Sequence, residues 1–225
     1  MKNKILLGLL IFLLSCMIGY ALFSESIAIT GTATASGNFS INVTCQPGIL
    51  SKLGTVQSLG LNKEGGYQND TCSVKNNKIS VSTEFLYPTA HRYFTVKIKN
   101  TGTIDIKYDA AKITSTDKIC VANNIAGNNK KCKTLTNADS QISLEDYRAN
   151  FGFYRLAVEK PNGDLLTEEE VMEFYDPVNE IFIAKPGYSV YWYAYLWLEH
   201  SNENNGDMFV EYESSFEIPL IQATN

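Results

Sequence analysis

Five cysteines are the residues whose type and spacing point most directly to chemistry. Cys16 lies in an apolar N-terminal run, and the other four form an even set. In an exported chain such a set predicts two disulfide bonds. We favour the sequence-local pairing, which joins Cys45 to Cys72 and Cys120 to Cys132, and each small loop would stabilise the fold by roughly 3 kcal/mol. A zinc site built from the four thiolates is the alternative, but no CxxC pair is present.

Acidic residues supply a second set of groups that could do chemistry. The triplet from Glu168 to Glu170 could act as acid, base or metal ligand, but it opens a predicted helix, where the macrodipole favours negative charge. Asp105, Asp109 and the stretch 202–207 offer oxygens that suit calcium, yet no EF-hand spacing is present. We interpret the triplet as helix-terminal charge and the other acids as solvated turn residues.

The chain has 2 histidines, His91 and His200, and neither belongs to an HExxH pattern. No GxSxG motif is present, and the four later cysteines are assigned to disulfides, so nucleophilic catalysis has no candidate residues. The sequence therefore predicts no catalytic residue, no metal site and no cofactor, and we expect a protein that is not an enzyme.

An aromatic run, YSVYWYAYLWL at 188–198, is the one interface candidate that composition suggests. In an extended strand, alternate residues fall on opposite faces. One face carries Tyr191, Tyr193, Tyr195 and Trp197, and the other carries Trp192, Ala194, Leu196 and Leu198. Because both faces are apolar, the run predicts either a central strand covered on both sides or a strand whose aromatic face contacts a partner, such as a surface glycan. Core packing is the favoured interpretation.

The elements that position these residues are predicted to be strands, because the dominant hydrophobic period is two. Capping-box patterns predict two short helices, at 143–150 and 167–175. Strands are predicted at 22–31, 79–87, 151–160, 180–185, 188–199 and 210–218, with a hairpin over 94–108. Many short strands with few helices predict an all-β fold: a jelly-roll-like β-sandwich with two short helical insertions, occupying residues 38–225.

Composition limits what such a domain can do. Of 225 residues, 44% are hydrophobic, so the chain can bury a core and is not disordered throughout. The 19 basic and 24 acidic residues give a net charge of −5 without a basic run, which argues against nucleic-acid binding. The length suits one domain.

Residues 1–21 have the pattern of a signal peptide. Lys2 and Lys4 precede an uncharged apolar run over 5–23, and small residues lie near its end. Cleavage after Ala21 is favoured; it removes two lysines and no acid, which leaves a net charge of 17 − 24 = −7. Two alternatives stay open, because the apolar run is long enough for a membrane anchor and the residues before Cys16 resemble a lipobox. All three place the remainder outside the cytoplasm.

Residues 22–37 are predicted to be an N-terminal strand followed by a flexible segment. Leu22 begins the strand, and Phe23, Ile27 and Ile29 share one of its faces. Small residues follow, GTATASG at 31–37. An alternating strand on a flexible tether can pair with a sheet edge of another molecule, or it can pair within its own domain.

Several stretches share features with one known family. They are GYALFSES at 19–26 with IAITGTA at 27–33, FTVKIKNTGT at 94–103, and KPGYS at 185–189 with the aromatic strand and a last strand that ends in IQA. Together they resemble the TasA/camelysin family of bacterial secreted fibre proteins, over both ends and about half of the chain.

The resemblance implies a jelly-roll-like sandwich, removal of the signal and assembly into extracellular fibres. Family members polymerise by donating the mature N-terminal strand to an open sheet edge of the next subunit, and here that role would fall on Leu22, Phe23, Ile27 and Ile29. The four mature cysteines depart from the family pattern. Nothing resembles a zinc-peptidase motif, so no peptidase activity is implied.

We therefore expect a secreted, non-enzymatic subunit of a surface or biofilm-matrix filament, whose partners are copies of itself or related fibre subunits. The alternative is a membrane- or lipid-anchored surface binding domain, which would take glycans through Tyr191, Tyr193, Tyr195 and Trp197. No nucleic-acid partner is expected. Contact with a membrane is expected only through an uncleaved or lipidated N-terminus.

Overall fold

The computed structural model describes residues 37–76, 78–87, 89–109, 113–122, 129–136, 141–145, 147–176, 181–200, 209–217 and 219–222. The chain from Gly37 onward forms one compact unit. Residues 1–36 lie outside the described residues. The predictions for this segment concern Cys16 and the candidate donor residues Leu22, Phe23, Ile27 and Ile29.

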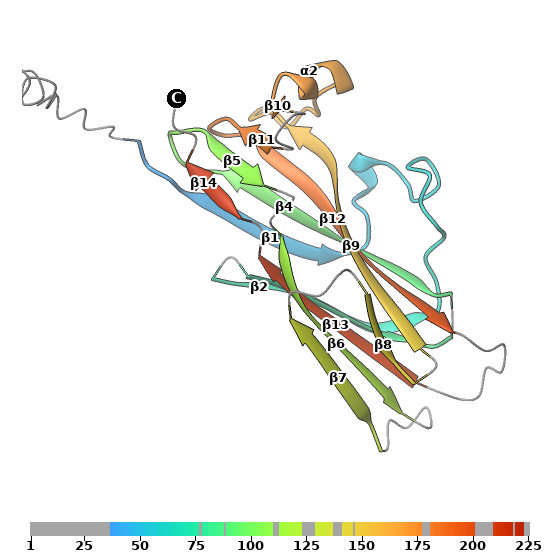
Figure 1. Cartoon of the computed structure of the whole chain (residues 1–225). Coiled ribbons are helices and arrows are strands. Elements are labelled where there is room, and N and C mark those ends of the chain that lie inside the picture. Colours follow the sequence, from blue (N-terminus) through green and yellow to red (C-terminus); the bar gives the residue numbers. More distant parts are fainter. Residues whose placement is uncertain are drawn as a thin grey trace, which may run out of the picture. The chain divides into compact units, whose positions relative to one another are not determined.

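Antiparallel strands in three sheets make up most of the described chain (Figure 1). The β12 sheet has the order β1 (Ile41–Pro47), β4 (His91–Asn100), β12 (Ser189–His200), β9 (Tyr147–Glu159) and β8 (Gln141–Leu144). The β13 sheet has the order β2 (Tyr67–Lys75), β3 (Lys78–Phe85), β13 (Phe209–Glu217), β6 (Thr114–Ala122) and β7 (Lys131–Thr136). The small β11 sheet has the order β10 (Tyr175–Asp176), β11 (Ile181–Ala184), β5 (Ile106–Asp109) and β14 (Leu220–Gln222).

The core lies between the β12 and β13 sheets. Alternate residues of each central strand are buried, as in Ala194 and Leu196 of β12 and Tyr212 and Phe216 of β13. The Phe216 ring contacts rings from β9 in the other sheet, at 5.1 Å from Phe151 and 5.0 Å from Phe153 between centroids. Burying one such side chain stabilises the fold by about 1.5–3 kcal/mol. The all-β prediction is confirmed, and the two packed sheets agree with a β-sandwich.

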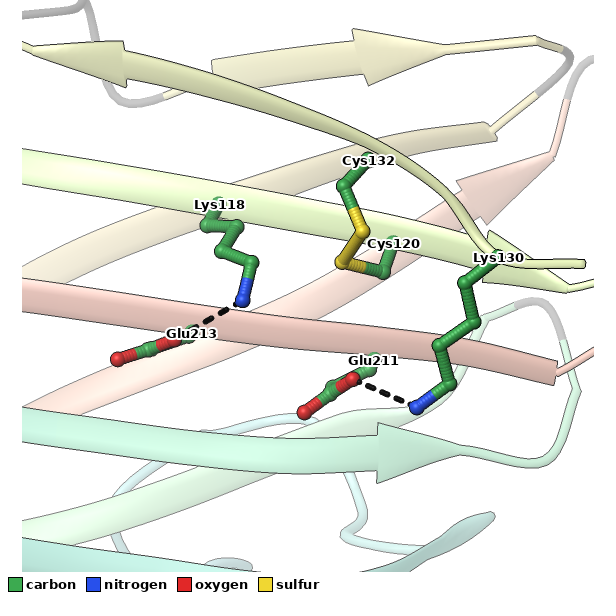
Figure 2. The surroundings of a disulfide bond; sticks show 6 residues. All are labelled: Lys118, Cys120, Lys130, Cys132, Glu211 and Glu213. Carbon is green, nitrogen blue, oxygen red and sulfur yellow. Dashed lines mark hydrogen bonds and ion pairs between the residues drawn. A yellow bond between two sulfur atoms is a disulfide. The ribbon is translucent and has the colours of Figure 1, made fainter. Parts of the chain in front are cut away.

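Two disulfide bonds are present, as predicted, and they join the sequence-local pairs. Cys45 of β1 is bonded to Cys72 of β2, which ties the edges of the two large sheets together. Cys120 of β6 is bonded to Cys132, directly opposite on β7, with 4.1 Å between the Cα atoms. Figure 2 shows this second bond beside the ion pair of Lys118 with Glu213 on the neighbouring strand. Disulfides of this kind are typical of oxidising compartments outside the cytosol.

One of the two predicted helices is present. In α2 (Glu168–Met172) the Thr167 hydroxyl accepts a hydrogen bond from the Glu170 N–H, and the Glu170 carboxylate accepts one from the Thr167 N–H. This reciprocal capping is the predicted capping box. The helix ends at Met172, and Tyr175 enters β10 instead.

The helix predicted at 143–150 is wrong, because this stretch forms the β8–β9 hairpin. Glu145 turns the chain with a φ of 53°, so a right-handed helix cannot pass through it. Tyr147 and Ala149 are buried while Arg148 between them is exposed. This period of two, set by the sandwich core, overrides the local capping pattern.

The hairpin predicted over 94–108 is also wrong, because β4 and β5 belong to different sheets. Both edges of β4 are occupied, by β1 and by β12. The Asn100 amide donates hydrogen bonds to the carbonyl oxygens of Ile104 and Ala184, at 2.8 and 2.9 Å, and so fixes the chain as it leaves the sheet. The turn residues therefore carry the chain across to the β11 sheet.

Candidate functional site

One half of β9 is an open sheet edge. Its first residues pair with β8, whose register ends at the pair Gln141 with Asn150. Beyond residue 157 the edge is closed again, since the Leu166 N–H donates to the Val158 carbonyl at 2.8 Å. Over residues 151–157, β9 pairs with β12 on one side, and no described strand pairs with its other side (Figure 1). We call this stretch the open edge.

A β-bulge gives the open edge an unusual side-chain pattern. The register of β9 against β12 shifts between Arg155, which lies opposite Trp192, and Ala157, which lies opposite Tyr191. Leu156 is the extra residue, so Arg155, Leu156 and Ala157 all reach the same cleft rather than alternating between faces.

This cleft, which we call the β9 cleft, has a volume of about 580 Å³. The short 3₁₀ turn η1 (Ser51–Leu53), the β9 bulge, the 165–166 segment and α2 contribute to its lining. Most of the lining side chains are apolar: Leu53, Leu156, Leu165, Leu166, Val171 and Met172. Met172 is 57% exposed, so the apolar lining of the cleft reaches the solvent in the described chain.

Among the described residues that line the β9 cleft, Arg155 is the one basic residue. Its guanidinium lies over the rings of Phe182 and Tyr175, at 5.2 and 5.7 Å from the centroids. Its Nη1 is buried, and no residue of the described chain accepts a hydrogen bond from it. Burial lowers the pKa of Arg155. A partly desolvated cation without an anionic partner in the described chain favours an incoming carboxylate, because part of the desolvation cost of the ion pair is already met.

Glu168 and Glu169 also line the β9 cleft. They lie in the first turn of α2, as the sequence predicted for helix-terminal acids, while Glu170 forms an ion pair with Lys160 at 2.6 Å and completes the capping box. The described lining of the cleft therefore contains one cation and two exposed carboxylates around an apolar centre.

Glu159 holds η1 against the sheet at the end of β9. Its carboxylate accepts hydrogen bonds from Lys52 of η1, from Lys97 at 2.9 Å and from the Tyr191 hydroxyl at 2.7 Å. Burial by itself would raise the pKa of Glu159, but these hydrogen bonds more than offset it and lower the pKa to about 2. The carboxylate is therefore ionised over the ordinary pH range, and Leu53 stays in place beside the cleft.

The predicted aromatic face divides into two parts. Its strand, β12, is central in its sheet, between β4 and β9. Tyr191 is only 1% exposed, covered by the lysines that bind Glu159, and so it is not an interface residue. Tyr193, Tyr195 and Trp197 are partly exposed and line a second, separate hollow with His91.

The remaining candidates from the sequence do not meet at either site. Asp105 is partly buried and lines neither the β9 cleft nor the second hollow. The structure does not describe the side chains of Asp109 and His200 or the stretch 202–207.

Two residues of the β9 cleft, Arg155 and Leu156, were not predicted from the sequence. The available signal was an arginine within the otherwise apolar strand FGFYRLAV, but only the register of β9 shows that this arginine lies at an open edge.

Comparison with known proteins adds little to this geometry. No family model matches the chain, and no curated protein matches it. A solved structure, the crystal structure of a loop-swap mutant of Necallimastix patriciarum Xyn11A, matches with 10% sequence identity and a TM-score of 0.17, over 71% of this chain and 98% of that chain. So low a TM-score supports no conclusion about fold or function.

Within the described residues, no helix is long and apolar enough to cross a membrane.

Proposed function

We propose that this chain is a secreted, non-enzymatic filament subunit that assembles by strand exchange, as its resemblance to the TasA/camelysin family implies. The observation that carries the proposal is the open edge of β9 beside the apolar β9 cleft. An open edge offers backbone N–H and C=O groups to an added strand, and the cleft offers a place for its side chains. In this proposal the two large sheets form a jelly-roll-like sandwich whose missing edge strand comes from another copy.

The donor would be the segment that begins at Leu22. In an extended strand, Phe23, Ile27 and Ile29 share one face, and Glu25 falls on that same face. This face is complementary to the β9 cleft. It is apolar apart from one carboxylate, and the cleft is largely apolar and contains the Arg155 guanidinium. Glu25 would pair with the unpartnered guanidinium of Arg155.

Cleavage after Ala21 would add a second complementary charge. The new α-amino group at Leu22 is a cation, and the exposed carboxylates of Glu168 and Glu169 lie in the same cleft. A donor strand that starts with a cation and carries a carboxylate three residues later thus matches both signs of charge in the β9 cleft. An uncleaved chain would lack the first of these matches.

A charge exchange tests the pairing of Glu25 with Arg155. Each single variant, Glu25→Arg or Arg155→Glu, should stop filament formation by the secreted protein, because like charges then meet in the cleft. The double variant should form filaments again, and so should a mixture of the two single variants, in which every interface regains an opposite pair. Electron microscopy and sedimentation measure assembly.

Controls separate assembly from folding. Arg155→Lys keeps the charge and should keep assembly, while thermal unfolding monitors whether Arg155→Glu still folds. Glu25→Arg leaves every described residue of the sandwich unchanged, so its result stands even if Arg155→Glu is unstable. Filaments formed by Glu25→Arg alone, at the level of the unmodified protein, would refute the pairing.

A further inference from the structure

A second hollow, which we call the tyrosine groove, lies on the outer face of the β12 sheet, away from the sandwich core. Its volume is about 270 Å³. Three strands supply its side chains: His91 and Tyr93 from β4, Tyr154 from β9, and Tyr193, Tyr195 and Trp197 from β12. The other wall is the loop of Gly60, Leu61 and Asn62.

The aromatic rings of the groove are fixed by packing. Tyr195 stacks on Tyr154, with 5.6 Å between centroids and 13° between planes, and on Trp197 at 6.2 Å and 10°. Gly152 makes this arrangement possible, because a Cβ atom there would lie 1.8 Å from the Tyr195 ring. The Tyr193 ring meets Tyr93 edge to face at 5.7 Å. Rings held by one another lose little freedom when a ligand binds.

The loop that forms the other wall is also fixed. Glu64 accepts hydrogen bonds from the Arg92 guanidinium at 2.6 Å and from the Tyr93 N–H at 3.0 Å. The Tyr93 hydroxyl donates to the Asn62 carbonyl at 3.1 Å. Hydrogen bonds therefore join the two walls of the groove. The groove is a preformed site, as small-molecule binding sites usually are.

The groove carries no charge near neutral pH. None of the described residues that line it is Lys, Arg, Asp or Glu. Burial lowers the pKa of His91, so its imidazole is neutral, and burial raises the pKa of Tyr93 to about 12 and also raises those of Tyr193 and Tyr195. An uncharged site gives no electrostatic compensation for desolvating an ion, so it selects against phosphates, carboxylates and amines.

We infer that the tyrosine groove binds a neutral sugar ring of a glycan. The aromatic faces suit the apolar C–H faces of a pyranose, and the phenol hydroxyls, His91 and the Asn62 amide suit its hydroxyl groups. The volume of about 270 Å³ lies just below the usual range of small-molecule pockets, roughly 300–1,000 Å³, which fits one or two ring units rather than a long peptide. The groove and the β9 cleft share no lining residue, although Tyr154 of the groove lies within the open edge, and the inference goes beyond the proposed strand exchange.

Intrinsic fluorescence tests the inference with neutral hexose oligosaccharides as probes. The chain has 2 tryptophans: Trp197 lies in the groove, while Trp192 is buried against Phe153. A bound sugar should change the emission of the secreted protein saturably, and Trp197→Phe should abolish the change. Tyr154→Ala should weaken binding by about tenfold, which corresponds to about 1.4 kcal/mol for the loss of one stacking face.

Tyr87→Ala is the matched control. Tyr87 is 50% exposed, close to the 52% of Tyr154, but it does not line the groove, so its variant should bind normally. Binding should be unchanged by salt, because no charges take part. The inference is overturned if no neutral oligosaccharide binds, or if Tyr154→Ala binds as well as the unmodified protein. Proline-rich peptides also dock in aromatic-lined grooves, so binding of such a peptide and of no sugar would overturn it as well. Filament formation by Trp197→Phe, which changes β12 and leaves the open edge intact, reports separately on strand exchange.

Discussion

At the scale of single residues, Glu159 shows how one buried carboxylate can organise several elements. It ends β9, binds Lys52 of η1 and Lys97 of β4, and accepts a hydrogen bond from Tyr191 of β12. Glu159 is 8% exposed, so the charge of its carboxylate depends on these partners more than on water. They lower its pKa to about 2 against the opposing effect of burial.

Glu159→Gln should therefore destabilise the protein in a pH-dependent way. A carboxyl group whose pKa is lowered in the folded state contributes stability above its unfolded pKa and loses it as the pH falls through the folded value. We expect a deficit of roughly 1–2 kcal/mol near neutral pH, since the lysines partly reach solvent. The deficit should shrink as the pH falls from about 4.5 towards 2. Urea unfolding at several pH values measures it, and a deficit that is constant with pH would contradict the assignment.

At the scale of elements, the predicted helix and the predicted hairpin are both wrong because strand pairing in the folded protein overrides the local sequence pattern. The 143–150 stretch has a helix-capping pattern, but burial of Tyr147 and Ala149 in the sandwich makes it a hairpin. The 94–108 stretch has a hairpin pattern, but β1 and β12 occupy the edges of β4. In α2 the local and tertiary preferences agree, and that prediction is confirmed.

The β6–β7 hairpin offers a test of the disulfide contribution at this scale. Cys120→Ala with Cys132→Ala removes a cross-strand bond of sequence separation 12, and the chain-entropy relation predicts a loss of about 3 kcal/mol in unfolding free energy. Lys118→Ala is a neighbouring control, because it removes only an exposed ion pair with Glu213 at 3.7 Å, worth at most about 1 kcal/mol. Equal losses in denaturant unfolding would contradict this ranking.

At the scale of the whole molecule, the state of the N-terminus distinguishes a released filament subunit from an anchored surface domain. Deleting residues 22–26 should leave a folded monomer that cannot polymerise, because the donor strand is lost while every described residue of the sandwich stays. Normal filaments from this deletion would refute strand exchange. Mass spectrometry of the native protein provides the companion measurement: a chain that starts at Leu22 or Phe23 supports release, a lipidated Cys16 supports an anchored lipoprotein, and an intact Met1 supports a membrane span.

Sequence by itself determined the features that depend on composition and short-range pattern. The period of two predicted β3, β4, β9, β12 and β13 of the two large sheets, but β1, β2, β6, β7 and β8 were not predicted. The even cysteine set predicted two disulfides, and the aromatic run favoured a central position for β12. These features depend on which residues are apolar and how far apart they stand along the chain, and both can be counted without knowing the fold.

Only the tertiary structure decided which surfaces are open. Tyr191 and Tyr193 belong to the same aromatic pattern, yet one is covered by lysines and the other lines a groove, because a distant loop and η1 cover different parts of one sheet face. Arg155 became a site residue through a bulge and through the short length of β8, neither of which has a local signal. Strand neighbours, sheet edges and covering loops join residues far apart in the chain, and so they follow from packing rather than from any single stretch of sequence.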